Sequence, residues 1–208
     1  CPPEFQVDPD CAAQTVTVSW VNPGCADDVM GYRVYRSDSL SGALNLWMEF
    51  ASQNDSSITL DAAVFGGSIA GCWTVTALDS LMPGPDGVLR RNESAPGDTV
   101  CTDNCPFYFL PNVFTPNLDG ANALYRPFPW KFVDSGDFRV FNRWGEEVWR
   151  TADPDLGWNG QHKTSGGMCA DGTYHYTCKA YTRRLVGTVV ERFSGTLQLM
   201  GGLDPGSE

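Results

Sequence analysis

The sequence predicts an all-β chain built from two β-sandwich domains in tandem. Three observations carry this prediction: apolar and polar residues alternate over short runs, apolar residues at 3.6-residue spacing are missing over long stretches, and Gly, Pro, Thr, Val and aromatic residues are plentiful. A chain of 208 residues is long enough for two ordinary hydrophobic cores. We expect almost no helix, and we place the boundary near Cys105, between domains 1–105 and 106–208.

Charge is distributed unevenly along the chain. The formal net charge is −11; residues 1–105 carry 14 acidic and 4 basic residues, whereas residues 106–208 carry 11 and 10. This balance argues against nucleic-acid binding, because phosphate backbones require basic patches. The acidity of the first half indicates a solvated surface, and the near-neutral second half should experience little long-range electrostatic steering.

The cysteine content indicates an oxidising, extracellular setting. Eight cysteines accompany only three lysines and two histidines, a composition typical of secreted proteins with disulfides. The sequence does not begin with Met, and it shows neither a charged-then-apolar leader nor a run of about twenty apolar residues. We therefore expect that the chain has no transmembrane segment of its own and that it is a fragment of a longer exported protein.

Three segments of the first half show the alternation of half-buried strands, with apolar side chains on one face. They are residues 15–20 with Val16, Val18 and Trp20, residues 31–36 with Tyr32 and Val34, and residues 72–77 with Trp73, Val75 and Ala77.

These segments resemble the strands of a fibronectin type III domain, which is an Ig-like β-sandwich. In that family a Trp on the second strand faces a Tyr on the third, as Trp20 and Tyr32 would here. Trp73 stands where the family usually has Tyr. The resemblance covers residues 2–103 and implies a spacer or a binding platform.

Turn-forming pairs such as Trp144-Gly145 divide the second half into short apolar runs, which predicts a β-sandwich of about seven strands. Residues 138–143 and 147–151 flank that pair and predict a hairpin. Residues 173–181 and 192–200 provide the closing strands. We expect five side chains to be mainly buried: Phe114, Val140, Trp158, Tyr174 and Leu197.

The segment from Leu110 to Asn122, Leu-Pro-Asn-Val-Phe-Thr-Pro-Asn-Leu-Asp-Gly-Ala-Asn, is the most specific feature of the sequence, because its turn formers prescribe a particular backbone path. Four further motifs follow it: Phe141-Asn-Arg-Trp-Gly145, Gly157-Trp-Asn-Gly160, Asp171-Gly-Thr-Tyr-His-Tyr176 and Ser194-Gly-Thr-Leu-Gln-Leu199. In this order they resemble the type B C-terminal sorting domain of the type IX secretion system of Bacteroidetes, often labelled gliding-motility-associated. The resemblance covers residues 108–201 and departs from the family pattern at Leu118, Ala123 and Tyr125.

The resemblance implies that residues 106–208 guide export across the outer membrane and lead to retention at the cell surface or to release. The implied partners are outer-membrane β-barrel proteins of that system, acting as translocon, shuttle or anchoring barrel. The candidate sorting residues are those that match the motifs: Pro111, Asn112, Phe114, Thr115, Pro116, Asn117, Asp119, Gly120, Asn142, Arg143, Trp144, Gly145, Trp158, Gly160, Gly172, Tyr174, Leu197 and Leu199.

Strand pairing at a sheet edge is the mechanism of recognition that we expect, because a free edge offers backbone N–H and C=O groups to a partner strand. The candidate edges are the closing strand Thr196–Met200 and the segment Pro111–Asn122. The fibronectin-like domain would then be a passenger or stalk. The alternative function is an adhesin tip, in which the fibronectin-like domain binds a protein or glycan and the C-terminal domain is only structural.

Two interpretations of the Leu110–Asn122 loop remain open. Asn117, Asp119 and Asn122 offer oxygens at near-alternate positions around Gly120, as calcium loops do. The same residues are also suited to cap a turn through hydrogen bonds to their own backbone. With a single carboxylate in the set, the turn is the favoured interpretation, and no other cofactor is expected.

The sequence predicts no enzyme and no catalytic residues. His162 and His175 stand in no nucleophile-elbow or metal-ligand pattern. The adjacent Glu146 and Glu147 would point to opposite faces of a strand. The aromatic residues Trp144 and Trp158 lie in turn signatures, where we expect them to pack against the core or a loop rather than bind a sugar.

The fibronectin-like resemblance also implies a disulfide scheme. In such a sandwich the N-terminus lies beside the loop between the second and third strands, which pairs Cys1 with Cys25. The opposite end gathers four cysteines whose pairing stays open: Cys11, Cys72, Cys101 and Cys105. Cys169 and Cys178 remain as the last pair.

Overall fold

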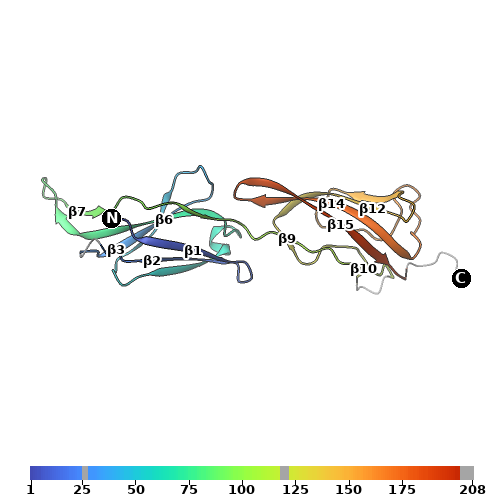
Figure 1. Cartoon of the computed structure of the whole chain (residues 1–208), viewed down its shortest axis with the longest axis horizontal. Helices are drawn as coiled ribbons and strands as arrows, with labels where there is room; N and C mark the ends of the chain where they lie inside the picture. The colour runs from blue at the N-terminus through green and yellow to red at the C-terminus, as the bar shows by residue number, and fades with distance from the viewer. Residues whose placement is uncertain (25–27, 118–121, 202–208) are drawn as a thin grey trace. The chain divides into compact units, whose positions relative to one another are not determined.

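The computed structural model describes residues 1–24, 28–117 and 122–201 and divides the chain into two compact units, Cys1–Cys105 and Pro106–Glu208 (Figure 1). Across the described residues the regular structure is almost entirely strand, with a single short 3₁₀ turn, η1 (Ala62–Phe65). The predicted all-β fold is confirmed.

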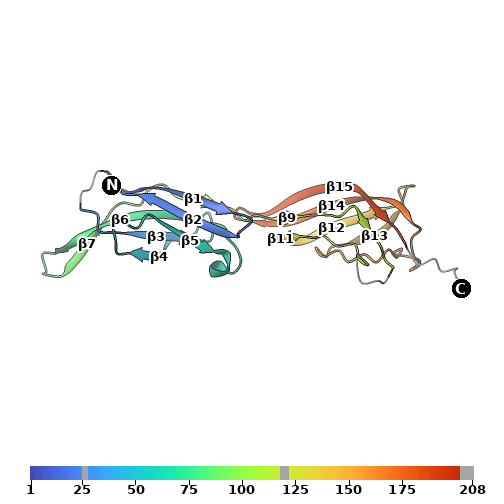
Figure 2. The ribbon, with the colours of Figure 1, turned by 90° about the horizontal axis from the view of Figure 1, so that it is seen from below.

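The N-terminal unit contains two sheets that enclose one core (Figures 1 and 2). One sheet has the order β1-β2-β5, and the other has the order β4-β3-β6-β7 with β8 paired to β6. The strands are β1 (Glu4–Asp10), β2 (Thr15–Val21), β3 (Gly31–Ser37), β4 (Asn45–Phe50), β5 (Ser57–Asp61), β6 (Gly71–Pro83), β7 (Leu89–Glu93) and β8 (Val100–Thr102).

Alternating apolar residues build this core as the sequence predicts. Val16 and Val18 of β2 and Val75 of β6 are completely buried in one cluster. Trp20 lies against Tyr32 with ring centroids 5.6 Å apart, which joins the two sheets through an aromatic pair.

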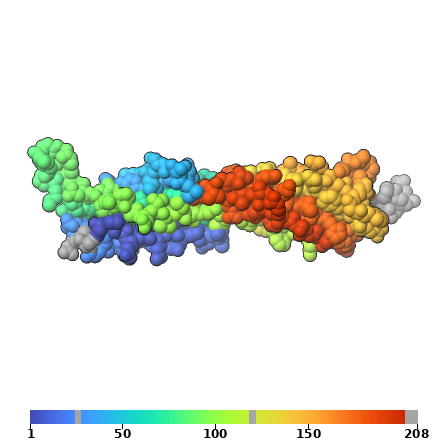
Figure 3. Space-filling view, turned by 45° about the horizontal axis from the view of Figure 1, so that its top comes forward, coloured from blue at the N-terminus to red at the C-terminus, as the bar shows by residue number. Residues whose placement is uncertain are grey.

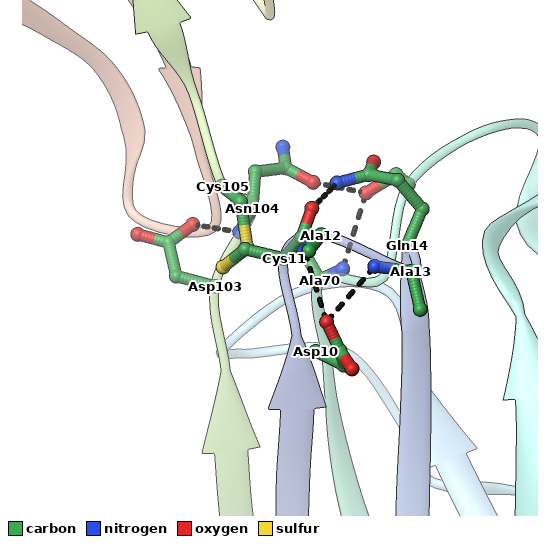
Figure 4. The surroundings of a disulfide bond; sticks show 10 residues. Asp10, Cys11, Ala12, Ala13, Gln14, Ala70, Asp103, Asn104 and Cys105 are labelled. Carbon is green, nitrogen blue, oxygen red and sulfur yellow. Dashed lines mark hydrogen bonds between the residues drawn. A yellow bond between two sulfur atoms is a disulfide. The ribbon is translucent and has the colours of Figure 1, made fainter.

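Disulfides close the N-terminal unit at one end. Cys11, just after β1, is bonded to Cys105, the last residue of the unit (Figure 4). Cys72 is bonded to Cys101 across the β6–β8 pair. The structure thus resolves the pairing that the sequence left open among these four cysteines.

The predicted Cys1–Cys25 bridge falls partly outside the described residues. Cys1 is disulfide-bonded. Cys25 lies outside the part of the chain that the structure describes, so this pairing stays a prediction.

The C-terminal unit is built on one five-stranded sheet with the order β10-β15-β14-β12-β13, accompanied by the two-stranded sheet β11-β9. All pairings in the large sheet are antiparallel except β10 with β15, which is parallel. The strands are β9 (Phe107–Tyr108), β10 (Val113–Phe114), β11 (Trp130–Lys131), β12 (Val133–Phe141), β13 (Glu147–Thr151), β14 (Gly172–Arg184) and β15 (Gly187–Leu199).

One face of the large sheet carries the core. The five side chains expected to be buried are all at most 7 % exposed, which confirms the strand assignments; they are Phe114, Val140, Trp158, Tyr174 and Leu197. Loops and the small sheet cover this face, and Tyr108 of β9 reaches Phe193 of β15 with ring centroids 6.2 Å apart.

The predicted Cys169–Cys178 disulfide is wrong, because both thiols are free. Cys169 precedes β14, whereas Cys178 lies six residues inside that strand from Gly172. At about 3.3 Å per residue this run spans roughly 20 Å, while a disulfide requires Cα atoms less than about 7 Å apart. Cys178 is instead buried in the core.

Candidate functional site

The first motif contributes strand β10, which lies at one edge of the large sheet. The backbone N–H of Gln198 donates to the carbonyl of Asn112 at 2.7 Å, and that of Met200 donates to the carbonyl of Phe114 at 3.2 Å. Phe114 is 1 % exposed, with its ring centroid 5.2 Å from that of Trp158. The segment therefore joins the core through Phe114 and the sheet through its backbone.

The closing strand is consequently not the free edge that the sequence predicts. At Gln198 and Leu199, β15 is paired with β10 on one side and with β14 on the other. Leu197 and Leu199 are buried core residues. The two candidate edges, Pro111–Asn122 and Thr196–Met200, instead pair with each other through Val113–Phe114 and Gln198–Leu199.

Hydrogen bonds hold the described ends of the motif loop. The N–H of Thr115 donates to the carbonyl of Asn122 at 3.0 Å, and the N–H of Asn117 donates to the carbonyl of Thr115 at 2.8 Å. Tyr125, where the sequence departs from the family pattern, donates its hydroxyl to the carbonyl of Pro111 at 2.8 Å. Burial first, and then neighbouring groups, raise the pKa of Tyr125 far above its usual range, so it stays a donor.

The calcium interpretation of this loop is not resolved by the geometry. Asp119 and Gly120 lie outside the described residues. Asn122 has a positive φ of 52°, a conformation suited to Asn in a turn. Calcium at Asn117, Asp119 and Asn122 therefore remains a prediction.

Gly160 brings three motifs together. Its φ is +84°, and a Cβ there would lie 3.2 Å from each of the side chains of Pro116, Met168 and Leu199. The neighbouring Trp158 is completely buried and donates its Nε1–H to the carbonyl of Gln161 at 2.8 Å. These motif residues therefore maintain the fold rather than face a partner.

A tight turn between β12 and β13 presents an exposed part of the motifs. The predicted hairpin is confirmed, with Gly145 at φ +82°. Asn142 holds the turn: its Oδ1 accepts the N–H groups of Trp144 and Glu146, both at 3.0 Å, and its Nδ2 donates to the Glu146 carboxylate at 2.9 Å. The side chain of Arg143 lies 4.3 Å from the centroid of the Trp144 ring.

Trp144 does not pack as the sequence predicts. It is 75 % exposed, whereas Trp158, the other Trp in a turn signature, is completely buried. The two signatures look alike in sequence because both place Trp next to Gly, and only the contacts of each turn separate them.

A second motif adjoins this turn. A small hollow of about 110 Å³ is lined on one side by Asn142, Arg143 and Trp144 and on the other by residues 170–174. Tyr174 is buried below it and donates its hydroxyl to the carbonyl of Ala170 at 2.7 Å. Burial, together with nearby Cys169 and Asp171, raises the pKa of Tyr174 to about 12.

The backbone beside this hollow is also specified by sequence. Gly172 has a φ of +149°, which favours glycine, and Asp171 accepts the N–H of Gly201 at 2.8 Å. Two motifs far apart in the chain, Asn142–Gly145 and Asp171–Tyr174, therefore form one structured surface. We name this surface, with Arg143 and Trp144 at its exposed rim, the Trp144 site.

Comparison with protein families decides the identity of the C-terminal unit. Residues 108–199 match the model of the CHU_C type IX secretion signal domain. The C-terminal unit is a type IX secretion signal domain. The resemblance inferred from the five motifs is confirmed, and the CHU_C domain accounts for nearly the whole C-terminal unit.

Solved structures similar to the whole chain include proteins with fibronectin type III domains. A two-domain fibronectin type III segment of chicken tenascin has 16 % identity and a TM-score of 0.43, over 95 % of this chain and 99 % of that one. Chicken CNTN1 FN1–FN3 has 14 % identity and a TM-score of 0.35, over 96 % and 66 %. A tetra-tandem repeat from the extending region of a large adhesion protein has 14 % identity and a TM-score of 0.34, over 96 % and 50 %.

Comparison with curated protein sequences gives no significant match. Among the described residues, no helix is long and apolar enough to cross a membrane. The type IX secretion signal implies export and association with the cell surface or outer membrane.

Proposed function

We propose that the CHU_C domain is the export signal of a bacterial surface protein, recognised by outer-membrane β-barrel proteins of the type IX secretion system, and that the N-terminal unit is its passenger or stalk. The observation that carries this proposal is the match of residues 108–199 to a secretion signal family. Both kinds of domain are non-catalytic, so the proposal includes no enzymatic activity.

The Trp144 site is the part of the signal that we assign to recognition. The other large aromatic residues of the motifs are buried or partly buried, whereas Trp144 is 75 % exposed on a turn that Asn142 holds rigid. An exposed Trp beside an Arg is a frequent anchor in protein interfaces, because both side chains contribute large binding energies when a partner covers them. A rigid turn also reduces the entropy lost on binding.

The test is export of the chain in a bacterium that has the type IX system, measured as surface display by antibody labelling of intact cells. Deletion of residues 106–208 is expected to abolish display. Trp144→Ala is expected to lower display while leaving the thermal melting of the purified chain unchanged. Normal display of the deleted chain would disprove the sorting role.

A matched control comes from the other turn Trp. Trp158→Ala removes a completely buried side chain from the core of the CHU_C domain and leaves a cavity, which is expected to cost about 3–5 kcal/mol of folding free energy. It should therefore reduce display through unfolding, with a lower melting temperature. If Trp144→Ala lowers both display and the melting temperature, Trp144 is a structural residue and not a recognition residue.

Adhesion is the second candidate function, favoured by one feature of the N-terminal unit. β6 and β7 extend as a hairpin whose tip stands out from the rest of this unit (Figure 3). Its exposed apolar side chains, each more than half exposed, are Leu81, Met82, Val88 and Leu89. Exposed apolar groups gathered in one place mark interaction surfaces.

The adhesin alternative is tested with display held constant. Replacing Leu81 and Leu89 by Thr is expected to reduce attachment of displaying cells to protein- or glycan-coated surfaces if the hairpin is the adhesive tip. Replacing the exposed Val64 by Thr, elsewhere in the same unit, is the control. Equal attachment of all three strains would remove this role.

A further inference from the structure

The face of the large sheet that points away from the core carries a cluster of basic residues. Strand register places Lys179 of β14 directly opposite Arg192 of β15, and Arg139 of β12 directly opposite Arg150 of β13. Lys179, Arg192 and Arg150 are exposed, and Arg139 is partly exposed. We name this surface the basic face.

Both pairs bring like charges together, which weakens a sheet. Residues directly opposite each other on antiparallel strands have Cβ atoms about 4.5–5.5 Å apart, and like charges at that distance are destabilising. Asp137, which lies directly opposite Lys179 on β12, offsets part of this cost, but the face keeps an excess of positive charge. Such a cost at an exposed site points to a ligand that is negatively charged.

Three of the four cations are available to a ligand. Arg139 is engaged by Asp137, with Nε–Oδ1 at 2.9 Å. Within the described residues, Lys179, Arg192 and Arg150 take part in no ion pair.

The positive potential of the basic face helps to lower the pKa of two nearby carboxyl groups, those of Asp137 and Glu147. Desolvation opposes ionisation of Asp137, yet its pKa lies below its ordinary value, first through the hydrogen bond from Arg139 and further through the charges of Arg139, Lys179 and Arg150. The pKa of Glu147 is lowered first by Lys163 and then also by Arg139 and Arg150. The net charge of residues 106–208, 11 acidic against 10 basic residues, conceals this local excess.

The basic face is hollowed. A depression of about 450 Å³ lies over the three central strands, within the range of ligand-binding pockets. Hydroxyl groups extend the Arg139 row, because Arg139 lies opposite Thr177, which in turn faces Ser194. The residues lining the depression include the cations Arg139, Lys179 and Arg192, together with Phe141, Thr177 and Ser194, and one carboxylate, Asp137, which is held by Arg139.

We propose that the basic face binds an extended acidic segment of a partner polypeptide. The Arg139 row and the Lys179–Arg192 row are two residues apart along β12 and β14, or about 7 Å. Residues on one face of an extended segment recur at the same spacing, so carboxylates at alternate positions of the partner match successive rows of cations. The hydroxyl groups of Thr177 and Ser194, in the same row as Arg139, supply hydrogen bonds to the partner's carboxylates.

This inference deepens the proposed sorting function and rests on it for its biological use, but its test requires no export. The probe is a synthetic peptide in which Glu and Thr alternate, and its binding to the full 208-residue chain is measured by fluorescence anisotropy. At low salt, saturable binding is expected, and raising the salt to about 0.5 M should weaken it about tenfold or more, because the Debye length shrinks to a few ångström. A peptide with Gln in place of Glu should not bind.

The variant Lys179→Gln with Arg192→Gln removes one like-charge pair. It is expected to weaken peptide binding at least about tenfold. Its melting temperature should change little, because the variant removes both the repulsion between Lys179 and Arg192 and the attraction between Lys179 and Asp137. The matched control, Arg126→Gln with Arg183→Gln, removes the same charge from residues that pair with Asp155 and Asp134, and it should bind like the wild type.

Equal loss of binding in both double variants would overturn the proposal, because net charge alone would then explain the binding. Binding to vesicles that contain phosphatidylglycerol but not to the acidic peptide would overturn it in favour of a lipid. Absence of binding by every probe would also overturn it. None of these results affects the deletion test of export. Conversely, normal display of the chain lacking residues 106–208 would disprove the sorting role without changing the peptide binding measured on the full chain.

Discussion

The side chain of Asn142 fixes Trp144, since one amide oxygen accepts the N–H groups of both Trp144 and Glu146 at 3.0 Å. Asn142→Ala removes this acceptor and should loosen the turn at a cost of about 1 kcal/mol. Hydrogen exchange at these two amides, followed by NMR, is expected to accelerate about tenfold. Asn142→Asp keeps an acceptor oxygen and should largely preserve protection; equal acceleration in both variants would show that the side-chain oxygen does not hold the turn.

The second prediction compares two Phe residues of the CHU_C domain. Phe114 is 1 % exposed, whereas Phe128 is 81 % exposed. Phe114→Ala should lower the free energy of unfolding by about 3–5 kcal/mol through lost burial and a cavity, and Phe128→Ala should change it by less than about 0.5 kcal/mol. Denaturant titration of each purified chain measures the difference, and equal effects would contradict the assignment of Phe114 to the core.

Disulfide removal should act according to the size of the loop each bond closes. Cys11–Cys105 spans 94 residues and Cys72–Cys101 spans 29. Replacing the first pair by Ala should cost about 1 kcal/mol more than replacing the second, because the closed loop in the unfolded chain is about three times longer. Protection of Val18 and Val75 amides against hydrogen exchange measures this cost.

Protection of the Val140 amide in the CHU_C domain serves as the internal control, since neither bond lies in that unit. A larger loss of Val18 and Val75 protection from removing Cys72–Cys101 would show that native packing around that bond outweighs loop entropy.

The buried thiol of Cys178 should make stability depend on alkaline pH. Burial, and secondarily the charge of Asp137, raises its pKa from 9.0 to about 12. The folded state therefore keeps a proton that the unfolded state loses, so this contribution is complete below pH 9 and is lost as the pH rises towards 12, by up to about 1.4 kcal/mol per pH unit. Cys178→Ala should show a shallower decline than the wild type over this range in denaturant titrations.

Thiol labelling provides the complementary measurement. Cys178 should resist a thiol reagent in the folded chain at pH 8 and react once the chain is unfolded, because the thiolate is the reactive form. Rapid labelling of Cys178 in the folded chain, or identical pH profiles of the wild type and Cys178→Ala, would show that the site is open to solvent.

Much of the fold follows from local patterns in the sequence. Alternation at Val16, Val18 and Trp20 identified β2, and turn residues around Trp144-Gly145 identified the β12–β13 hairpin. These features depend on neighbours along the chain, so periodicity and turn chemistry are sufficient to predict them.

The remaining features depend on contacts between distant segments. The parallel pairing of β10 with β15 joins residues more than eighty positions apart, and no local pattern announces it. The separation of Cys169 from Cys178, by contrast, already follows from the predicted strand at residues 173–181, whose extended backbone carries Cys178 away from Cys169. The like-charge pair Lys179 and Arg192 became visible only through strand register, because in sequence the two residues lie on different segments.

The Cys11–Cys105 bond has a mechanical consequence. A pulling force that enters the N-terminal unit at β1 and leaves at Pro106 passes through this bond, and residues 12–104 are left outside the covalent path. Without the bond, unravelling of the unit would release about 100 residues, or roughly 350 Å of chain. With it, this unit can lengthen only by the short stretch before Cys11, so it keeps a nearly constant length under load.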